Sequence, residues 1–273
     1  LVIWRNDALT NLDGLSNVAS VRGSRWGLRI SSNASLTSLD GLRGLTSVEV
    51  LSISDNVALT NLDGLSSLTA VGGLYLGGND SLTSLDGLNG LTTVGGLSIG
   101  GNGALTSLDG LNGLTTVGAL SIGDNGALTN FEGLDNLTSV EGPLSIGDNG
   151  GLTSFNGLNN ITSVEGPLSI SATTMLTSFD GLNSLTSVGG LVIEENAALA
   201  SIDGLGRLTS VGADLFFMRN DALTNLNGLS SLTHVGEDLD IRFNNALTNL
   251  DGLSRVAAVG EILHLWSNSS LPT

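Results

Sequence analysis

The side chains best suited to binding a partner gather near the C-terminal end of the chain. Phe216–Arg219, Asp240–Phe243 and His264–Trp266 mix aromatic, Met and Arg residues, a combination typical of interface cores. We expect one ligand-binding surface made of Glu194, Phe216, Met218, Arg219, Asp240, Arg242, Phe243, His264 and Trp266. The expected apolar anchors are Phe216, Met218, Phe243 and Trp266, and the expected orienting charges are Arg219, Asp240 and Arg242.

The residue pairs that catalysis needs are missing from the sequence pattern. His234 and His264 fall on different rows of the repeat described below, and Glu194 and Glu195 are neighbours that must point in different directions. The chain has no Cys, which excludes thiol nucleophiles, disulfides and thiolate metal sites. No phosphate-binding loop follows a strand pattern. We therefore expect no enzymatic activity, no cofactor and no metal centre.

A repeat fills the whole chain and determines its architecture. Leu82–Ala104 recurs almost unchanged as Leu105–Ala127. The leucine that opens each unit recurs in a first step of 27 residues and then in steps of 23 or 24, at positions 9, 36, 59, 82, 105, 128, 152, 176, 199, 223, 247 and 271. A fixed period of this length is typical of solenoids, so we expect residues 1–273 to form one elongated domain of about 11 repeats.

Each unit contains one short strand pattern. In Leu97-Ser98-Ile99 the alternation predicts that Leu97 and Ile99 point inward and that Ser98 points outward. About 12 such strands, from Leu1–Ile3 to Leu263–Leu265, are expected to stack into one parallel sheet.

The rest of each unit is too short and too rich in Gly for a full α-helix. Leu108, Leu111 and Leu114 recur at a spacing of three residues, which predicts a 3₁₀ turn that faces the core. We expect Asp109, just before Gly110, to cap this turn.

The segment Val94–Leu105 resembles the LxxLxLxxNxxL core of the leucine-rich-repeat family. The longer V-x-G-x-L-x-I cadence resembles the bacterial relatives of receptor L domains and, more loosely, internalin-like surface proteins. The resemblance implies a right-handed coil, with a parallel sheet on one face and 3₁₀ turns on the other. It also implies an extracellular or cell-surface location and a non-enzymatic role in recognition or adhesion.

Several residue types form ladders along the predicted coil. An asparagine recurs in the turn after nearly every strand, and we expect its amide to be buried and to satisfy main-chain groups. The carboxylates of the acidic ladder, which includes Asp109, are spaced one per unit and so do not supply the several oxygens of a calcium site. Two threonine ladders, through Thr106 and Thr115, are expected to bond to nearby main chain.

The sequence contains five N-glycosylation sequons, and their positions predict which of them would carry a glycan in a secreted eukaryotic protein. Those at Asn33, Asn79 and Asn268 belong to the asparagine ladder and should point inward, where no glycan fits. Those at Asn136 and Asn160 fall in the outer turns and are the expected glycosylation sites.

Composition limits the range of partners. The net charge is −17 and all nine cationic residues are Arg, so neither nucleic acid nor an anionic membrane surface is an expected partner. No apolar run is long enough to span a bilayer. The chain begins within a strand pattern at Leu1–Ile3 and stops just after a new unit opens at Leu271, so we expect it to be a piece of a longer protein.

Three functions are compatible with this pattern. The first is recognition of a protein or glycan ligand through the C-terminal strands. The second is a structural role in an extracellular filament or surface layer, with coils that associate end to end. The third is ice binding by the regular Thr and Ser ladders. At the N-terminal end Trp4, Arg5, Arg29 and the inserted Arg22–Trp26 also break the pattern, and we expect these residues to contact a capping segment outside this sequence. Contact with such a segment is also the alternative interpretation of the C-terminal cluster.

Overall fold

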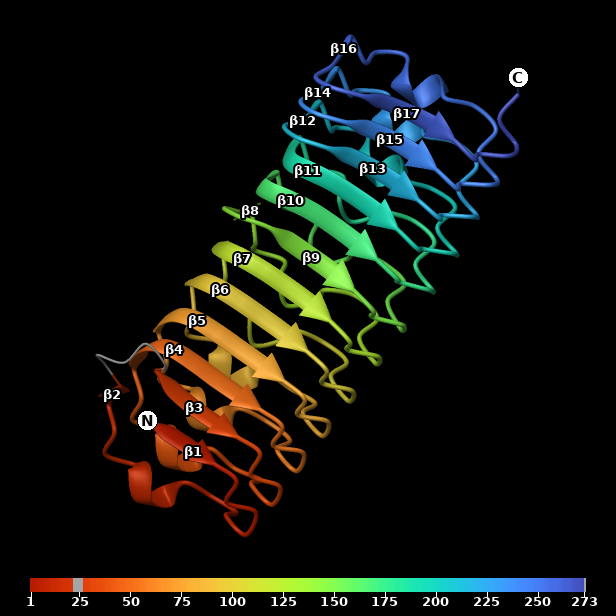
Figure 1. The fold of residues 1–273 in the computed structure, drawn as a ribbon. Helices are drawn as coiled ribbons and strands as arrows, with labels where there is room; N and C mark the ends of the chain where they lie inside the picture. The colour runs from red at the N-terminus through yellow and green to blue at the C-terminus, as the bar shows by residue number, and fades with distance from the viewer. Residues whose placement is uncertain (22–26, 273) are drawn as a thin grey trace.

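A computed structural model describes residues 1–21 and 27–272, which form a mostly β solenoid (Figure 1). The chain winds in successive coils, and each coil adds strand to one parallel sheet, so the two termini lie at opposite ends of the molecule. This arrangement confirms the solenoid and the parallel sheet that the repeat predicted. The inserted Arg22–Trp26 lies outside the described residues.

Among residues 1–21 and 27–272, twelve strands form the main row of the sheet, in agreement with the about 12 that the repeat predicted. They are β1 (Val2–Trp4), β3 (Leu28–Ser31), β4 (Ser47–Ser54), β5 (Ala70–Gly77), β6 (Thr93–Gly100), β7 (Thr116–Gly123), β9 (Leu144–Gly147), β10 (Ser163–Ser171), β11 (Ser187–Glu194), β13 (Leu215–Met218), β15 (Leu239–Arg242) and β17 (Leu263–Trp266). Each strand pairs in register with that of the next coil, as Leu97 with Leu120 and Ile99 with Ile122. Leu97 and Ile99 are buried while Ser98 is only partly covered, which confirms the predicted alternation.

A second row of pairing lies before the main strands. It consists of β2 (Ser20–Val21), β8 (Ser139–Val140), β12 (Ser210–Val211), β14 (His234–Val235) and β16 (Ala258–Val259). In coils such as that of β6 the two rows join into one strand, because the chain stays extended through the intervening Gly95 and Gly96. The sheet is therefore wider than the three-residue strand pattern predicted.

The turns opposite the sheet have two conformations. Seven are 3₁₀ turns, namely η1 (Asp13–Leu15), η2 (Asp40–Leu42), η3 (Asp63–Leu65), η4 (Asp86–Leu88), η5 (Asp203–Leu205), η6 (Asn227–Leu229) and η7 (Asp251–Leu253). The prediction of a 3₁₀ turn at Leu108–Leu114 is wrong, since the four central coils have plain turns whose glycines adopt positive φ, as Gly110 does at 105°. In three of these coils a carbonyl of the turn accepts a hydrogen bond from the preceding coil, as Glu132 O does from Leu108 N–H at 3.0 Å.

The predicted capping role of Asp109 is also wrong. No side chain caps the 3₁₀ turns from the residue before them, and each aspartate is the first residue inside its turn. A Ser or Asn two residues earlier accepts the aspartate N–H instead, as Ser84 Oγ does from Asp86 at 3.0 Å. Ser107 Oγ in turn donates to the carboxylate of Asp109 at 3.1 Å, which places that carboxylate at the exposed surface.

Each coil contributes a layer of buried aliphatic side chains to one continuous core. In three adjacent coils a phenylalanine replaces a leucine. Phe131 and Phe155 stack with ring centroids 5.7 Å apart, and Phe155 meets Phe179 edge to face at 5.2 Å. The inward Leu263 and Leu265 of the last strand are exposed by 55% and 39%, because no described coil covers them.

The asparagine ladder is buried as predicted from Asn33 to Asn268, whereas Asn6 in the first coil is exposed. Asn125 illustrates the pattern: its Nδ2 donates to Ile99 O of the preceding coil at 3.0 Å, and its Oδ1 accepts from the main-chain N–H of Asn102 at 3.1 Å. The sequons at Asn33 and Asn79 are fully buried, which confirms that these side chains point inward. Thr173 takes the ladder position in one coil, where its Oγ1 donates to Asn196 Oδ1 at 2.6 Å.

Candidate functional site

The sheet register brings the nine predicted binding residues together at the C-terminal end. Phe216, Asp240 and His264 stand side by side in one row across β13, β15 and β17. The next row joins strands β11 to β17 through Glu194, Met218, Arg242 and Trp266. Arg219 and Phe243 follow in the positive-φ turn. We call these nine residues the C-terminal patch: Glu194, Phe216, Met218, Arg219, Asp240, Arg242, Phe243, His264 and Trp266.

Positive φ in this turn is a regular feature of the coil. Arg219 and Phe243 have φ of 55° and 58°, and Glu195 has φ of 59° at the same position. A non-Gly residue seldom adopts this conformation. Here a main-chain hydrogen bond to the next coil stabilises it, as where Glu195 N–H donates to Met218 O at 3.0 Å. The large side chains in this turn are therefore held in place by the coil itself.

Aromatic and guanidinium groups interlock along the edge of the patch. The rings of Phe243 and Trp266 meet at 4.7 Å with their planes inclined by 66°. Arg219 lies over Phe243 at 5.8 Å and Arg242 lies over Trp266 at 5.7 Å. Trp266 is 46% exposed, so its ring offers apolar area to a partner while its neighbours hold its orientation.

The burial of Asp240 departs from the exposed orienting group that we predicted. Only 5% of this residue is accessible, because Phe216, Arg242 and His264 surround it. Its Oδ2 lies 3.5 Å from Arg242 Nη1 and 3.8 Å from His264 Nδ1, which is too long for good hydrogen bonds. Its Oδ1 has no hydrogen-bond partner at all.

A small cavity opens beside this carboxylate. It has a volume of about 110 Å³ and is lined by Val192, Glu194, Phe216, Met218, Asp240 and Arg242. Glu194 makes no ion pair within the described chain, whereas Glu195 pairs with Arg219 at 2.9 Å. The prediction that these two glutamates point in different directions is confirmed.

The central part of the sheet presents a different surface. Its outward row consists mostly of Ser and Gly, but Tyr75 on β5 is 46% exposed, which the repeat pattern did not indicate. Its ring leans back over Gly73 and borders a hollow of about 210 Å³ floored by Gly96 and Ala119. Tyr75 was overlooked because it breaks the Ser row in a single coil, and only the packed sheet shows that small residues clear space around it.

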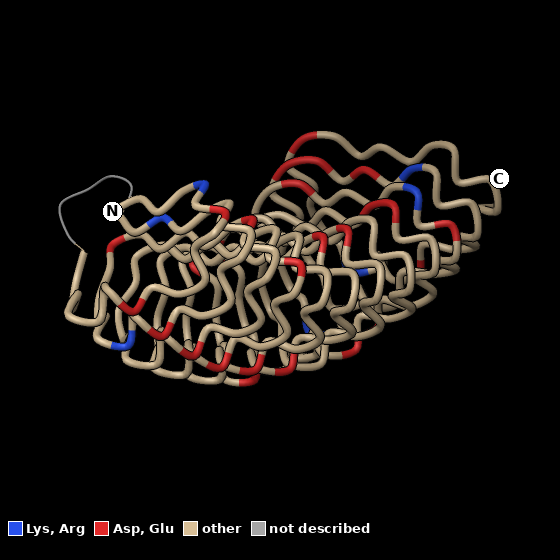
Figure 2. The backbone as a smooth tube through the Cα atoms, turned by 90° about the horizontal axis from the view of Figure 1, so that it is seen from below, with Lys and Arg blue, Asp and Glu red and all other residues tan. Residues whose placement is uncertain are grey.

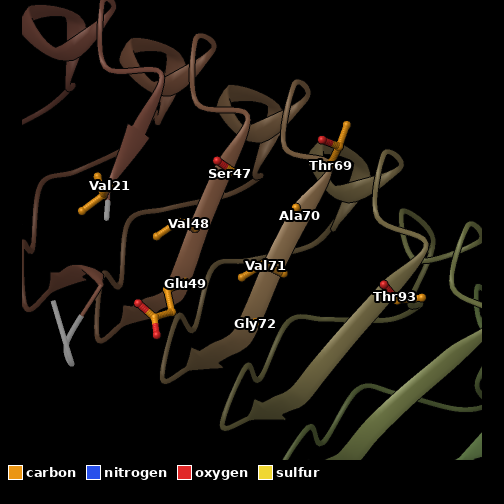
Figure 3. A pocket seen from close by; sticks show the side chains of 9 residues that line it. All are labelled: Val21, Ser47, Val48, Glu49, Thr69, Ala70, Val71, Gly72 and Thr93. Atoms are coloured by element: carbon orange, nitrogen blue, oxygen red, sulfur yellow. The ribbon is translucent and has the colours of Figure 1, made fainter. Parts of the chain in front are cut away.

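A further hollow lies where the two rows of the sheet meet (Figure 3). It has a volume of about 460 Å³, and successive valines, Val21, Val48 and Val71, border it together with Glu49. A hollow of about 470 Å³ recurs between β10 and β11 around Val164 and Val188. This recurrence shows that the hollow is a property of the coil, and we assign no specific site to it.

The threonine ladders bond only in part as predicted. In the ladder through Thr115 most hydroxyls donate to a carbonyl oxygen of the preceding coil, as Thr138 Oγ1 does to Thr115 O at 3.1 Å. In the ladder through Thr106 fewer do so, as Thr153 Oγ1 does to Thr129 O at 3.2 Å. The side chains of the exposed Asn136 and Asn160 likewise donate to carbonyl oxygens of the preceding coil, as Asn136 Nδ2 does to Asn112 O at 2.7 Å. Both amides therefore lie on the outer surface.

Charge is distributed unevenly along the solenoid. No Arg occurs between Arg43 and Arg207, whereas Asp and Glu line the coil through this interval (Figure 2). Two of the three ion pairs between Arg and a carboxylate in the described chain involve residues of the patch. His234 and His264 lie on different rows, since His234 pairs with Ser210 and Ala258, and His264 pairs with Asp240.

No three His, Asp or Glu side chains converge as metal ligands among residues 1–21 and 27–272. None of these residues belongs to a helix with the length and apolarity needed to cross a bilayer. The sequence matches no protein-family model and no curated protein. The candidate site therefore rests on its own geometry.

Proposed function

We propose that this protein is a non-enzymatic recognition protein of the leucine-rich-repeat type, cell-surface or secreted, which binds a protein or glycan through the C-terminal patch. The repeat type is supported by the combination of an L-x-I strand with a buried asparagine in the following turn, as in Leu97–Asn102. The absence of a converging His, Asp and Glu group in the described residues is compatible with a binding role.

The observation that carries the proposal is the concentration of Trp266, Phe243, Arg219 and Arg242 on a sheet whose central coils expose mainly Ser and Gly. Trp and Arg dominate binding hot spots, whereas Ser is under-represented there. Neighbouring side chains already hold these groups in place. Their ordering on binding would therefore cost little conformational entropy. This preorganisation is what a recognition surface needs and a structural coil does not.

Binding of the purified chain to a glycan array and a displayed-peptide library tests the proposal. For a ligand found in either format, we expect Trp266→Ala or Arg242→Ala to weaken binding by about 30-fold, the loss typical of a hot spot of about 2 kcal/mol. Ser145→Ala, on the outward face of β9, is the matched control and should leave binding unchanged. Equal affinity of all three variants and the parent chain would refute the assignment of the patch.

Light scattering separates recognition from the filament alternative. Recognition predicts a particle mass that does not change with concentration, whereas a filament subunit grows with concentration and tolerates Trp266→Ala on a retained fold. Ice binding receives less support, because most hydroxyls of the ladder through Thr115 already donate to the main chain. Thermal hysteresis in solutions of the purified chain would revive it.

A further inference from the structure

The cavity beside Asp240 combines buried negative charge with apolar walls. Glu194 on β11 and Asp240 on β15 both line it, together with Phe216 and Met218 of the intervening strand β13. Its volume is about 110 Å³, which is room for the end of one side chain.

The carboxylate of Asp240 has Arg242 nearby but lacks the hydrogen bonds that a buried charge needs. A buried ionised group is strongly destabilising unless it is paired and hydrogen-bonded, and Asp240 Oδ1 has no hydrogen bond while Oδ2 has only two long contacts. Rotation about the last torsion of an aspartate is soft and nearly two-fold. Either oxygen can therefore turn toward a donor that enters the cavity.

We propose that this cavity is a binding site for the primary ammonium group of a lysine side chain presented by a protein ligand. The ammonium donates to Asp240 and lies within reach of the charge of Glu194, and its methylene stem packs against Val192, Phe216 and Met218. The ring of Phe216 adds a face that attracts a cation. This inference rests on the proposed recognition function and names the group that is recognised.

The charges of the molecule favour this occupant over an anion. Two carboxylates and one guanidinium line the cavity. The guanidinium, of Arg242, lies over Trp266 and 3.5 Å from Asp240 Oδ2, so the lining keeps an excess of negative charge. The net charge of −17 draws cations toward the whole molecule. An amino sugar carries the same ammonium group, but its hydroxyls would be stranded against the apolar walls, so we favour lysine.

A chemical-shift titration of the full chain with Nα-acetyl-lysine methylamide tests the site. We expect saturable shifts confined to β11, β13 and β15, with a dissociation constant in the millimolar range that rises with added salt. Asp240→Asn and Glu194→Gln should each weaken binding, Asp240→Asn by at least about tenfold because charge-assisted bonds are the strong ones. Asp148→Asn removes the same charge at the exposed turn after β9, where φ is 55°, and should leave binding within about twofold.

Three results would overturn the proposal. The first is that the analogue whose Nε is also acetylated binds as tightly as Nα-acetyl-lysine methylamide. The second is that Asp148→Asn weakens binding as much as Asp240→Asn does, which would indicate general attraction to the acidic chain. The third is tighter binding of glucosamine than of the lysine derivative. Asp240→Asn should keep or raise the melting temperature. If this variant fails to fold, the binding of the lysine derivative by Glu194→Gln tests the site instead. Loss of the lysine site alone, with array ligands still sensitive to Trp266→Ala, would leave the recognition function standing.

Discussion

Replacing Asn125 by alanine removes one member of the asparagine ladder near the middle of the solenoid. Asn125 Oδ1 accepts from the main-chain N–H of Asn102 at 3.1 Å, and Nδ2 donates to the carbonyls of Ile99 at 3.0 Å and Gly123 at 2.9 Å. All of these contacts lie at a buried or partly buried turn. The alanine variant leaves the N–H of Asn102 without its acceptor.

The magnitude follows from these bonds. An unpaired buried donor costs about 1–3 kcal/mol, and each of the two lost carbonyl contacts adds about 1 kcal/mol. We therefore expect Asn125→Ala to lower the free energy of unfolding by about 3–5 kcal/mol. Each coil contacts only its neighbours, so the loss is centred on the coils of Asn102 and Asn125.

Urea unfolding followed by circular dichroism measures this loss, with Asn112→Ala as the matched control. Asn112 is exposed and its side chain makes no hydrogen bond in the described chain, so its replacement should change stability by less than about 0.5 kcal/mol. Amide exchange should show faster opening of Asn102 in the Asn125→Ala variant. A loss below about 1 kcal/mol would refute the reasoning, because it would mean that water replaces the amide in the turn.

Three further predictions follow from single positions. Thr173→Asn restores the amide ladder and should raise the free energy of unfolding by about 1 kcal/mol, measured by urea unfolding; destabilisation would contradict it. Gly110→Ala should lower the free energy of unfolding by about 2–5 kcal/mol, because φ is 105° and a Cβ would lie 2.1 Å from Leu85 O. Gly103→Ala is the control and should be tolerated, because a Cβ there meets open space. Secretion from a eukaryotic host should place glycans on Asn136 and Asn160, detectable as a mass increase that N-glycosidase removes.

Part of the candidate site could be predicted from sequence. The repeat aligns Phe216 with Asp240 and His264 without any coordinates, since a period of 24 residues places them at the same position of successive coils. The burial of Asp240 could not be predicted in this way, because it depends on how Phe216 and Arg242 lie over the carboxylate. Tyr75 was missed for a related reason, since the space beside it exists only where Gly and Ala of neighbouring coils meet.

The turns opposite the sheet show the same division within the fold. The motif Asp-Gly-Leu is identical in Asp86–Leu88 and Asp109–Leu111, yet the first is a 3₁₀ turn and the second is a turn with a positive-φ glycine. The second conformation occurs in four coils, and in three of them a carbonyl of the turn accepts a hydrogen bond from the preceding coil, as Glu132 O does from Leu108 N–H. Local sequence is therefore insufficient to choose between them.

The sequence by itself determined the solenoid, the strand register and the buried asparagine ladder. It did so because a strict period forces equivalent residues into contact, and because apolar alternation and a buried amide each have one favourable arrangement per coil. The tertiary structure alone decided the turn conformations, the width of the sheet and the burial of Asp240. These depend on contacts between side chains and peptides of adjacent coils, whose energies are set by geometry that repeat spacing does not specify.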